Sequence, residues 1–172
     1  MSRPITTLFM LMSVDGKISP GASDELDADK DFPNIPGLKE GLHQYYEIEQ
    51  TTDLWSFNTG RVQAKLRVNE KSFPEKTDLK SALIDLREKY GCERLTIQSG
   101  GTVNGMFLRE KLFDYVDIVV APVLIGGKDT STLIDGKSLL NQEELDSLGV
   151  LKLEECTVLE DSYIRIRYKV IS

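Results

Sequence analysis

Residues 95–105 read Leu-Thr-Ile-Gln-Ser-Gly-Gly-Thr-Val-Asn-Gly, and they are the most informative stretch of the chain. An apolar, β-branched run ends at Gly100 and Gly101, and a helical pattern follows. Glycines where a strand gives way to a helix let backbone N–H groups come close to an anion. The Gly-Gly-x-x-x-Gly spacing matches neither the dinucleotide fingerprint nor a P-loop, and a glycine pair alone is more often an ordinary turn. The stretch therefore indicates a nucleotide diphosphate site only in combination with its surroundings.

The composition is that of one globular domain, which we expect to span residues 1–172. Hydrophobic residues make up 40% of the chain and charged residues 28%, and the apolar runs are too short to cross a bilayer. The 28 acidic residues outnumber the 21 basic ones, giving a net charge of −7, which disfavours a nucleic-acid partner. Residues 1–12 resemble a first strand more than a signal peptide. We therefore expect neither a membrane nor a nucleic-acid role.

The cysteines and the histidine provide no metal site. Cys92 and Cys156 lie far apart in the sequence, and His43 is the only histidine. A zinc site needs several such ligands at short spacings, so no metal is expected. Two well-separated cysteines fit reduced thiols, which favours the cytoplasm.

Strands and helices alternate along the chain. Strands are expected at residues 5–12, 53–58, 94–99 and 115–123. Helices are expected from Pro36 to residue 49, from an N-cap at Thr77 to Gly91, after Gly101, and at 143–148. The acidic clusters at 24–31 and 143–146 suggest solvated loops and helix starts. Residues 151–159 and 163–171 read as a hairpin with one wet face. The pattern predicts an α/β fold with a mostly parallel central sheet, flanking helices and a C-terminal antiparallel hairpin.

Four motifs, in order, resemble the reductase domain of the bifunctional riboflavin-biosynthesis deaminase-reductase. They are residues 7–18, Thr59-Gly60-Arg61, residues 98–104 and residues 119–127. The resemblance covers almost the whole chain and implies a dihydrofolate reductase-like fold, NADPH as cofactor and a homodimer. It also implies an activity: reduction of the ribosyl group of 5-amino-6-(5-phosphoribosylamino)uracil, or a close pyrimidine analogue, to ribityl. Such a hydride transfer requires the protein mainly to position cofactor and substrate.

The resemblance also implies site residues. The cofactor contacts that it implies are Thr59, Gly60, Arg61, Ser99, Gly100, Gly101, Thr102, Val103 and Asn104. Arg61 would fork onto the 2′-phosphate and favour NADPH over NADH, although a surface arginine at a helix start is the commoner role. The implied substrate contacts are Ser13, Asp15, Lys17 and Gln98. Asp15 is the candidate proton donor, with a turn residue that bonds its own backbone as the alternative.

Several positions depart from the family pattern. Phe9 stands where the family usually has lysine, Gln98 where it has glutamate, and Val62-Gln63-Ala64-Lys65 where it has a threonine and paired aspartates. Between residues 69 and 77, a strand and a helix of the family pattern are missing. Either the protein is a shortened member of the family, or a segment is omitted from the sequence as given. These departures weaken the substrate assignment more than the cofactor assignment.

Two other functions therefore stay open. A pterin-type reductase would need a buried acidic side chain on the first helix to bind the amidine of the pteridine. Glu40, Glu47 and Glu49 are the candidates for this side chain. A non-catalytic nucleotide-binding protein would keep the glycine junction without turnover.

Overall fold

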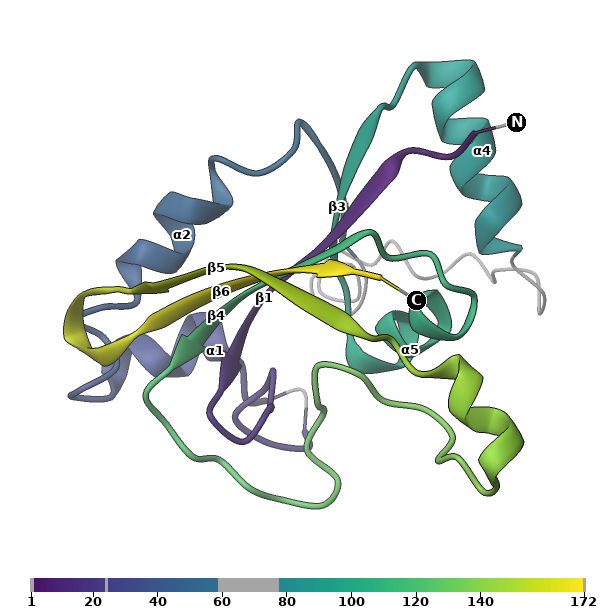
Figure 1. Ribbon diagram of the computed structural model, residues 1–172. Helices are drawn as coiled ribbons and strands as arrows, with labels where there is room; N and C mark the ends of the chain where they lie inside the picture. Colours follow the sequence, from purple (N-terminus) through teal and green to yellow (C-terminus); the bar gives the residue numbers. More distant parts are fainter. Residues whose placement is uncertain (1, 24, 59–77, 172) are drawn as a thin grey trace.

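The computed structural model, which describes residues 2–23, 25–58 and 78–171, contains a six-stranded mixed sheet (Figure 1). The strands are β1 (Ile5–Ser13), β2 (Trp55–Asn58), β3 (Arg94–Gln98), β4 (Tyr115–Ala121), β5 (Leu151–Val158) and β6 (Ile164–Val170). Their order in the sheet is β2-β3-β1-β4-β6-β5. β1 runs parallel to β3 and β4, and β2 runs parallel to β3, whereas β6 is antiparallel to both β4 and β5. The expected parallel sheet with a C-terminal antiparallel pair is confirmed.

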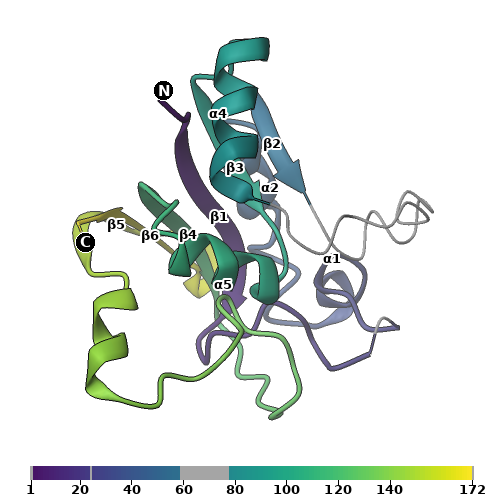
Figure 2. The same ribbon diagram turned by 90° about the vertical axis from the view of Figure 1, so that its right-hand side faces the viewer.

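Helices cover both faces of the sheet (Figure 2). One face packs against α4 (Leu79–Tyr90) and α5 (Gly101–Arg109), and we call it the α5 face. The other packs against α2 (His43–Glu49) and the region of α1 (Ala28–Asp31) and η1 (Phe32–Asn34), and we call it the α2 face. The described residues also include two 3₁₀ helices, η3 (Gln142–Ser147) and η4 (Glu160–Ser162).

The alternation of side chains along β1 divides the core into two clusters. Leu8 is buried on the α5 face with Ile97 and Phe107, while Phe9 is buried on the α2 face with Tyr45. Successive residues of a strand point to opposite faces, so a central strand covered on both sides must be apolar at nearly every position. This explains the continuous apolar run at residues 8–12.

The ends of α4 are defined by capping. Gly91 adopts the left-handed conformation at φ 70°, as expected for the residue just past a helix end. The N-cap is Asp78, whose carboxylate accepts a hydrogen bond from the Ser81 N–H, and not Thr77 as the sequence suggested. Aspartate is among the best N-cap residues, so the helix begins one position later than expected.

Two further expectations need correction, and a third is confirmed. The helix expected from Pro36 begins only at His43, because residues 36–42 form turns in which Gly37 has a φ of +88°. The acidic cluster at 24–31 was expected to include a helix start, and it contains the short helix α1, which is capped by Asp27. The expected helix at 143–148 is the 3₁₀ helix η3, starting one residue earlier.

Candidate active site

The carboxyl ends of β1, β3 and β4 meet at one edge of the sheet, which we call the carboxyl edge. The three strands are parallel neighbours with β1 in the middle. The chain leaves β1 to build β2 and β3 on one side and then builds β4 on the other, so β1 marks a topological switch point. In open α/β sheets, ligands bind in the crevice outside the strands at such a point. The loops that follow these three strands form the candidate active site.

The glycine pair lies between β3 and α5, as the sequence predicts. Gly100 is the N-cap of α5, and the first intrahelical bond joins the Asn104 N–H to the Gly100 carbonyl at 3.0 Å. The N–H groups of Gly101, Thr102 and Val103 therefore lack an intrahelical acceptor. Such a helix start favours an anion through both its N–H donors and the helix dipole.

The two glycines are required for different reasons. A Cβ atom added at Gly100 would meet nothing within 4 Å. At Gly101 it would overlap Oδ2 of Asp135 and the carbonyl oxygen of Thr132. Gly101 thus lets the loop that contains Thr132 pack against the helix, whereas Gly100 leaves open space in front of the helix start.

Ser99 and Asn104 are both buried and bind to each other at this junction. The Ser99 hydroxyl donates to Oδ1 of Asn104, and the Asn104 amide donates to the carbonyls of Ser99 at 3.0 Å and Leu133 at 2.9 Å. Both amide protons of Asn104 are therefore engaged within the protein. These two residues hold the junction in shape and leave the backbone N–H groups of α5 as the donors for a ligand.

The loop after β1 is anchored by Asp15. Its carboxylate accepts hydrogen bonds from the Ser13 hydroxyl at 2.6 Å and from the N–H groups of Ile125 at 3.1 Å and Gly126 at 2.6 Å. The Ser13 hydroxyl, followed by these two N–H groups, lowers the pKa of Asp15 from 3.8 to about 2. Asp15 is therefore ionised at neutral pH, and a carboxyl group with this pKa is a poor proton donor.

Lys17 joins the same two loops from the other side. Its ammonium group donates to the carbonyls of Gly127 at 2.8 Å and Thr130 at 2.9 Å. Together Asp15 and Lys17 tie the loop after β1 to the loop after β4, so in this structure both predicted substrate contacts bind backbone groups.

Gln98, at the end of β3, faces α2. Its amide nitrogen lies 2.5 Å from Oε1 of Glu49 and 3.5 Å from the Tyr45 hydroxyl. Tyr45 also stacks on Phe9 with ring centroids 5.2 Å apart, and burial raises its pKa, so the phenol stays protonated. Tyr45 was not expected at the site from the sequence, and Glu49 could not be distinguished there from two other acidic residues. Their i, i+4 spacing, which places both on one side of a helix, was the available signal.

Part of the expected site lies outside the described residues. Thr59, Gly60 and Arg61 belong to residues 59–77, as do the departures at 62–65. Among the residues that the structure describes, no group of three or more His, Cys, Asp or Glu side chains could hold a metal ion. No helix in that part of the chain is long and apolar enough to span a bilayer.

Comparison with protein families identifies the domain. Residues 47–161, more than half of the chain, match the model of the RibD C-terminal domain. The chain belongs to this family. The match includes the end of α2, the β3–α5 junction and β4, and it begins after β1.

Individual relatives of the RibD C-terminal domain agree with this assignment. The chain is 33% identical over 72 residues to the 2,5-diamino-6-ribosylamino-4(3H)-pyrimidinone 5′-phosphate reductase of Archaeoglobus fulgidus, covering 40% of this chain and 33% of the relative. It is 31% identical over 87 residues to the protein of the same name from Methanothermobacter thermautotrophicus, covering 51% and 39%. The matched segments thus span only a third to two fifths of these relatives.

A solved structure shows the same fold. Acinetobacter baumannii RibD superposes with a TM-score of 0.64 at 18% identity, over 99% of this chain and 59% of that one.

Proposed function

We propose that this protein is an NADPH-dependent reductase that converts the ribosyl group of a ribosylamino-pyrimidine 5′-phosphate to a ribityl group. The main support is the start of α5, where unpaired N–H groups and the open space at Gly100 face the switch point of the sheet. The two archaeal relatives carry the name of a reductase for such a substrate. The chain as a single domain and the cytoplasm as its compartment, where Cys92 and Cys156 would stay free thiols, belong to the same proposal.

The described residues fit the diphosphate of a dinucleotide. Thr102 and Val103 offer backbone N–H groups, and Gly100 leaves room for phosphate oxygens to approach. The proposed cofactor contacts remain Ser99 through Asn104, with Ser99 and Asn104 acting by shaping the junction, together with Thr59, Gly60 and Arg61. NADPH, when bound, supplies the hydride.

The chain itself contributes positioning. Asp15 and Lys17 lock the loops after β1 and β4 to each other, which fixes one wall of the crevice. Gln98 and Glu49 form the opposite polar wall, and we assign them to substrate recognition. Because Asp15 is ionised, we assign it to holding the loops, and not to the proton transfer that its position first suggested.

A titration followed by an assay tests the proposal. NADPH binding is measured by fluorescence, and turnover by the loss of nicotinamide absorbance with the diaminopyrimidinone ribotide or its deaminated uracil analogue. The Gly100→Ala variant should bind NADPH at least about tenfold more weakly, since the added methyl group displaces a phosphate oxygen. Its thermal unfolding should be unchanged, because φ at Gly100 is −68° and the added Cβ meets nothing. Equal NADPH affinity of the two proteins would refute the assigned cofactor site.

A second candidate function is a pterin-type reductase. Glu49 supports it, because this half-buried carboxylate reaches the site from the helix that covers the α2 face. Dihydropterin is the test substrate: turnover with it and none with the ribotides would favour this function. NADPH binding without turnover of either would leave a nucleotide-binding protein.

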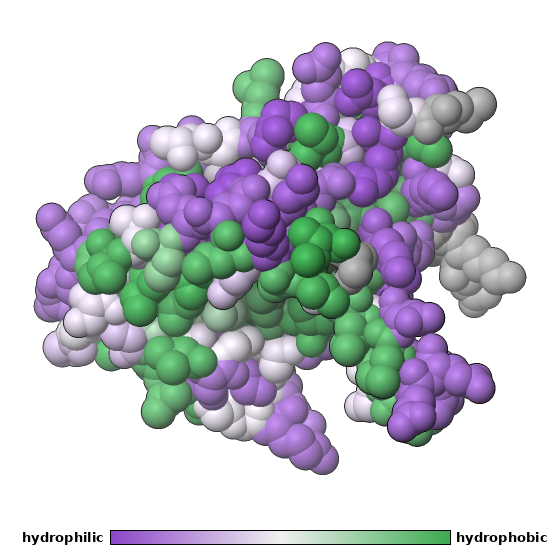
Figure 3. Space-filling model, viewed as in Figure 1, coloured by the Kyte–Doolittle hydropathy of each residue, from purple (hydrophilic) through white to green (hydrophobic). Residues whose placement is uncertain are grey.

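We also propose that two copies pair through β5 and β6. Leu151, Leu153 and Val158 are 41%, 54% and 79% exposed. Their strand partners are Val170, Tyr168 and Ile164, so these side chains share one face of the sheet. Figure 3 shows a hydrophobic band across this region. A large exposed apolar band is typical of an interaction surface, and sedimentation of wild type against Leu153→Lys tests this one.

A further inference from the structure

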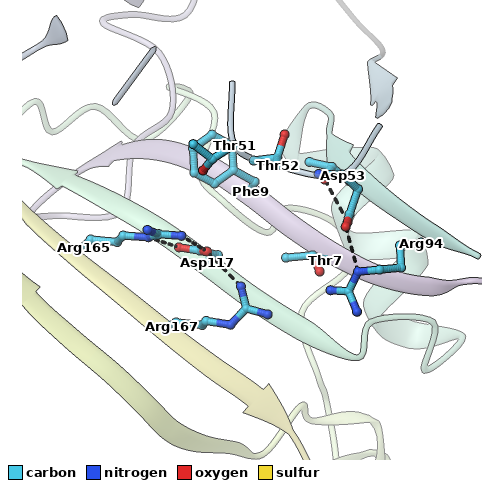
Figure 4. A pocket seen from close by; sticks show the side chains of 10 residues that line it. Thr7, Phe9, Thr51, Thr52, Asp53, Arg94, Asp117, Arg165 and Arg167 are labelled. Atoms are coloured by element: carbon cyan, nitrogen blue, oxygen red, sulfur yellow. Dashed lines mark hydrogen bonds and ion pairs between the residues drawn. The ribbon is translucent and has the colours of Figure 1, made fainter. Parts of the chain in front are cut away.

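A second polar pocket lies on the α2 face, away from the carboxyl edge (Figure 4). It has a volume of about 280 Å³. We call it the arginine pocket, and the residues on which its chemistry depends are Thr7, Asp53, Arg94, Asp117, Arg165 and Arg167. They come from β1, β3, β4, β6 and the segment before β2.

The arginines of the pocket are held in place by two carboxylates. Asp117 accepts from Nε and Nη2 of Arg165 at 3.0 and 2.7 Å, and from Nη1 of Arg167 at 3.2 Å. Asp53 accepts from Nε of Arg94 at 2.8 Å. Glu154 lies 3.5 Å from Nε of Arg167. The carboxylates orient the guanidinium groups and offset much of their charge.

Several guanidinium N–H groups remain available. Among the described residues, both Nη groups of Arg94 and Nη2 of Arg167 have no hydrogen-bond partner. In Figure 4, Arg94 and Arg167 lie on either side of Thr7. A guanidinium fork already oriented through Nε by a carboxylate loses little freedom when its other edge binds an oxyanion.

Thr7 gives the pocket an unpaired hydroxyl group. The residue is 6% exposed, and its Oγ1 is the one buried side-chain polar atom in the described part of the chain with no hydrogen-bond partner. A buried hydroxyl without a partner costs stability, and such groups are rare in folded proteins. Thr7 lines the arginine pocket, so its hydroxyl lies where a bound group would accept its proton.

The arginine pocket is separate from the carboxyl edge. Thr7, Phe9, Leu11 and Ser13 follow one another on the α2 face of β1, and Phe9 and Leu11 are buried under α2. At about 3.3 Å per residue, the distance from Thr7 to Ser13 is roughly 20 Å. The Phe9–Tyr45 stack lies between them. A ligand in the pocket would therefore not contact the proposed cofactor site.

We propose that the arginine pocket binds a small tetrahedral oxyanion, free phosphate or the phosphate group of a phosphoester, between Arg94 and Arg167 with the Thr7 hydroxyl as a third donor. Its volume lies just below the range of sites for larger organic ligands, so it suits a small ion better than a dinucleotide. The available groups are donors arranged around one hydroxyl, as the oxygens of a phosphate require.

Nuclear magnetic resonance of the full chain with inorganic phosphate tests the location. Backbone amide signals of Thr7, Arg94 and Asp117, and the Nε signals of Arg94 and Arg167, should shift together along one binding curve. A second titration with ribose 5-phosphate tells whether the natural ligand is free phosphate or a phosphoester. A Kd lower than that of phosphate indicates a phosphoester, and a higher Kd indicates the free ion. Shifts confined to residues 99–104, or none at all, would overturn the proposal.

The Thr7→Val variant tests the chemistry. Without phosphate it should be at least as thermostable as wild type, because a methyl group replaces an unpaired hydroxyl. Its phosphate Kd should rise about tenfold, and its melting temperature should gain less from phosphate. Thr157→Val, on β5 outside the pocket, is the matched control and should keep the wild-type Kd. If Thr7→Val binds phosphate as wild type does, or if a second copy of the chain covers the pocket in solution, the assignment is wrong.

Discussion

The carboxyl edge and the arginine pocket offer hydrogen bonds to a ligand in opposite ways. At the carboxyl edge, the charged side chains Asp15 and Lys17 bind the protein's own backbone, and the backbone N–H groups at the start of α5 remain available. In the arginine pocket, side chains such as Arg94 and Thr7 keep unpaired donors. A backbone site is specified by local sequence, whereas a side-chain site is specified by which strands lie next to each other.

Among the variants considered, Asp117→Ala should cause the largest loss of unfolding free energy. The substitution changes the arginine pocket and leaves the carboxyl edge as it is. Asp117 is 2% exposed and pairs with two arginines, so its loss leaves both without their shared partner. We expect a loss of about 3–5 kcal/mol in unfolding free energy, measured by urea denaturation. Asp85→Ala, which removes the exposed pair with Lys89, should leave the midpoint unchanged. A small effect of Asp117→Ala would mean that the arginines are not held by this carboxylate.

Gly101→Ala should cause the next largest loss of unfolding free energy, and this substitution lies at the carboxyl edge. The new Cβ would overlap the Thr132 carbonyl, a backbone atom, so the loop must move. Overpacking of this kind costs about 1–3 kcal/mol, which thermal or urea unfolding measures. Gly100→Ala is the neighbouring control and should unfold as wild type does. Equal stability of the two variants would show that the loop near Asp135 does not pack as described.

Gln98→Glu should have an intermediate effect that depends on pH. The new carboxylate would face Glu49 at the position where the amide nitrogen now lies 2.5 Å away. Two like charges there raise the pKa of one group, so we expect a loss of about 1–2 kcal/mol at pH 7 that disappears near pH 4. Adding Glu49→Gln restores a carboxylate–amide pair. A double variant no more stable than Gln98→Glu would argue against direct contact.

Asp15→Asn should have the smallest effect on stability, and this effect should change with pH. The pKa of Asp15 is lower in the folded chain than its ordinary value of 3.8, so the ionised carboxylate stabilises the fold above that value. This contribution is lost as the pH falls from about 4 to about 2. The stability difference between wild type and Asp15→Asn should therefore shrink across that window. The Asp15→Asn variant should keep its turnover as long as the loops after β1 and β4 remain joined. If turnover is abolished while stability is intact, Asp15 takes part in the proton transfer after all.

The sequence was sufficient for the sheet and for the glycine junction because both depend on local pattern. The apolar run of β1 follows from burial on two faces, and Gly100–Gly101 lies where the pattern changes period. In β6, the alternation separates Ile166 and Tyr168, which pack against the core of the α5 face, from Arg165 and Arg167 of the arginine pocket. Residues 36–42 were wrongly predicted as helix because the apolar spacing continued through Gly37, whose positive φ ends helical geometry.

The role of individual polar side chains was less predictable. The sequence placed Asp15 and Asn104 near a ligand, but their partners include Gly126 and Leu133, which lie far along the chain. The contact between Gln98 and Glu49 likewise depends on where α2 packs. The arginine pocket combines Thr7, Arg94 and Arg167, which are neighbours only through the strand order of the sheet. No local sequence motif predicts such a set of residues, because they are far apart along the chain.

The register shift between Leu153 and Glu155 affects how the sheet ends. β5 is the outermost strand, and its pairing with β6 slips there, so Glu154 is the extra residue. An irregularity of this kind bends a border strand and interrupts the row of free backbone groups that another chain would need in order to pair with it. The β5 edge is therefore protected against open-ended growth into fibres, and the proposed pairing of two copies would use side chains on the surface of the sheet.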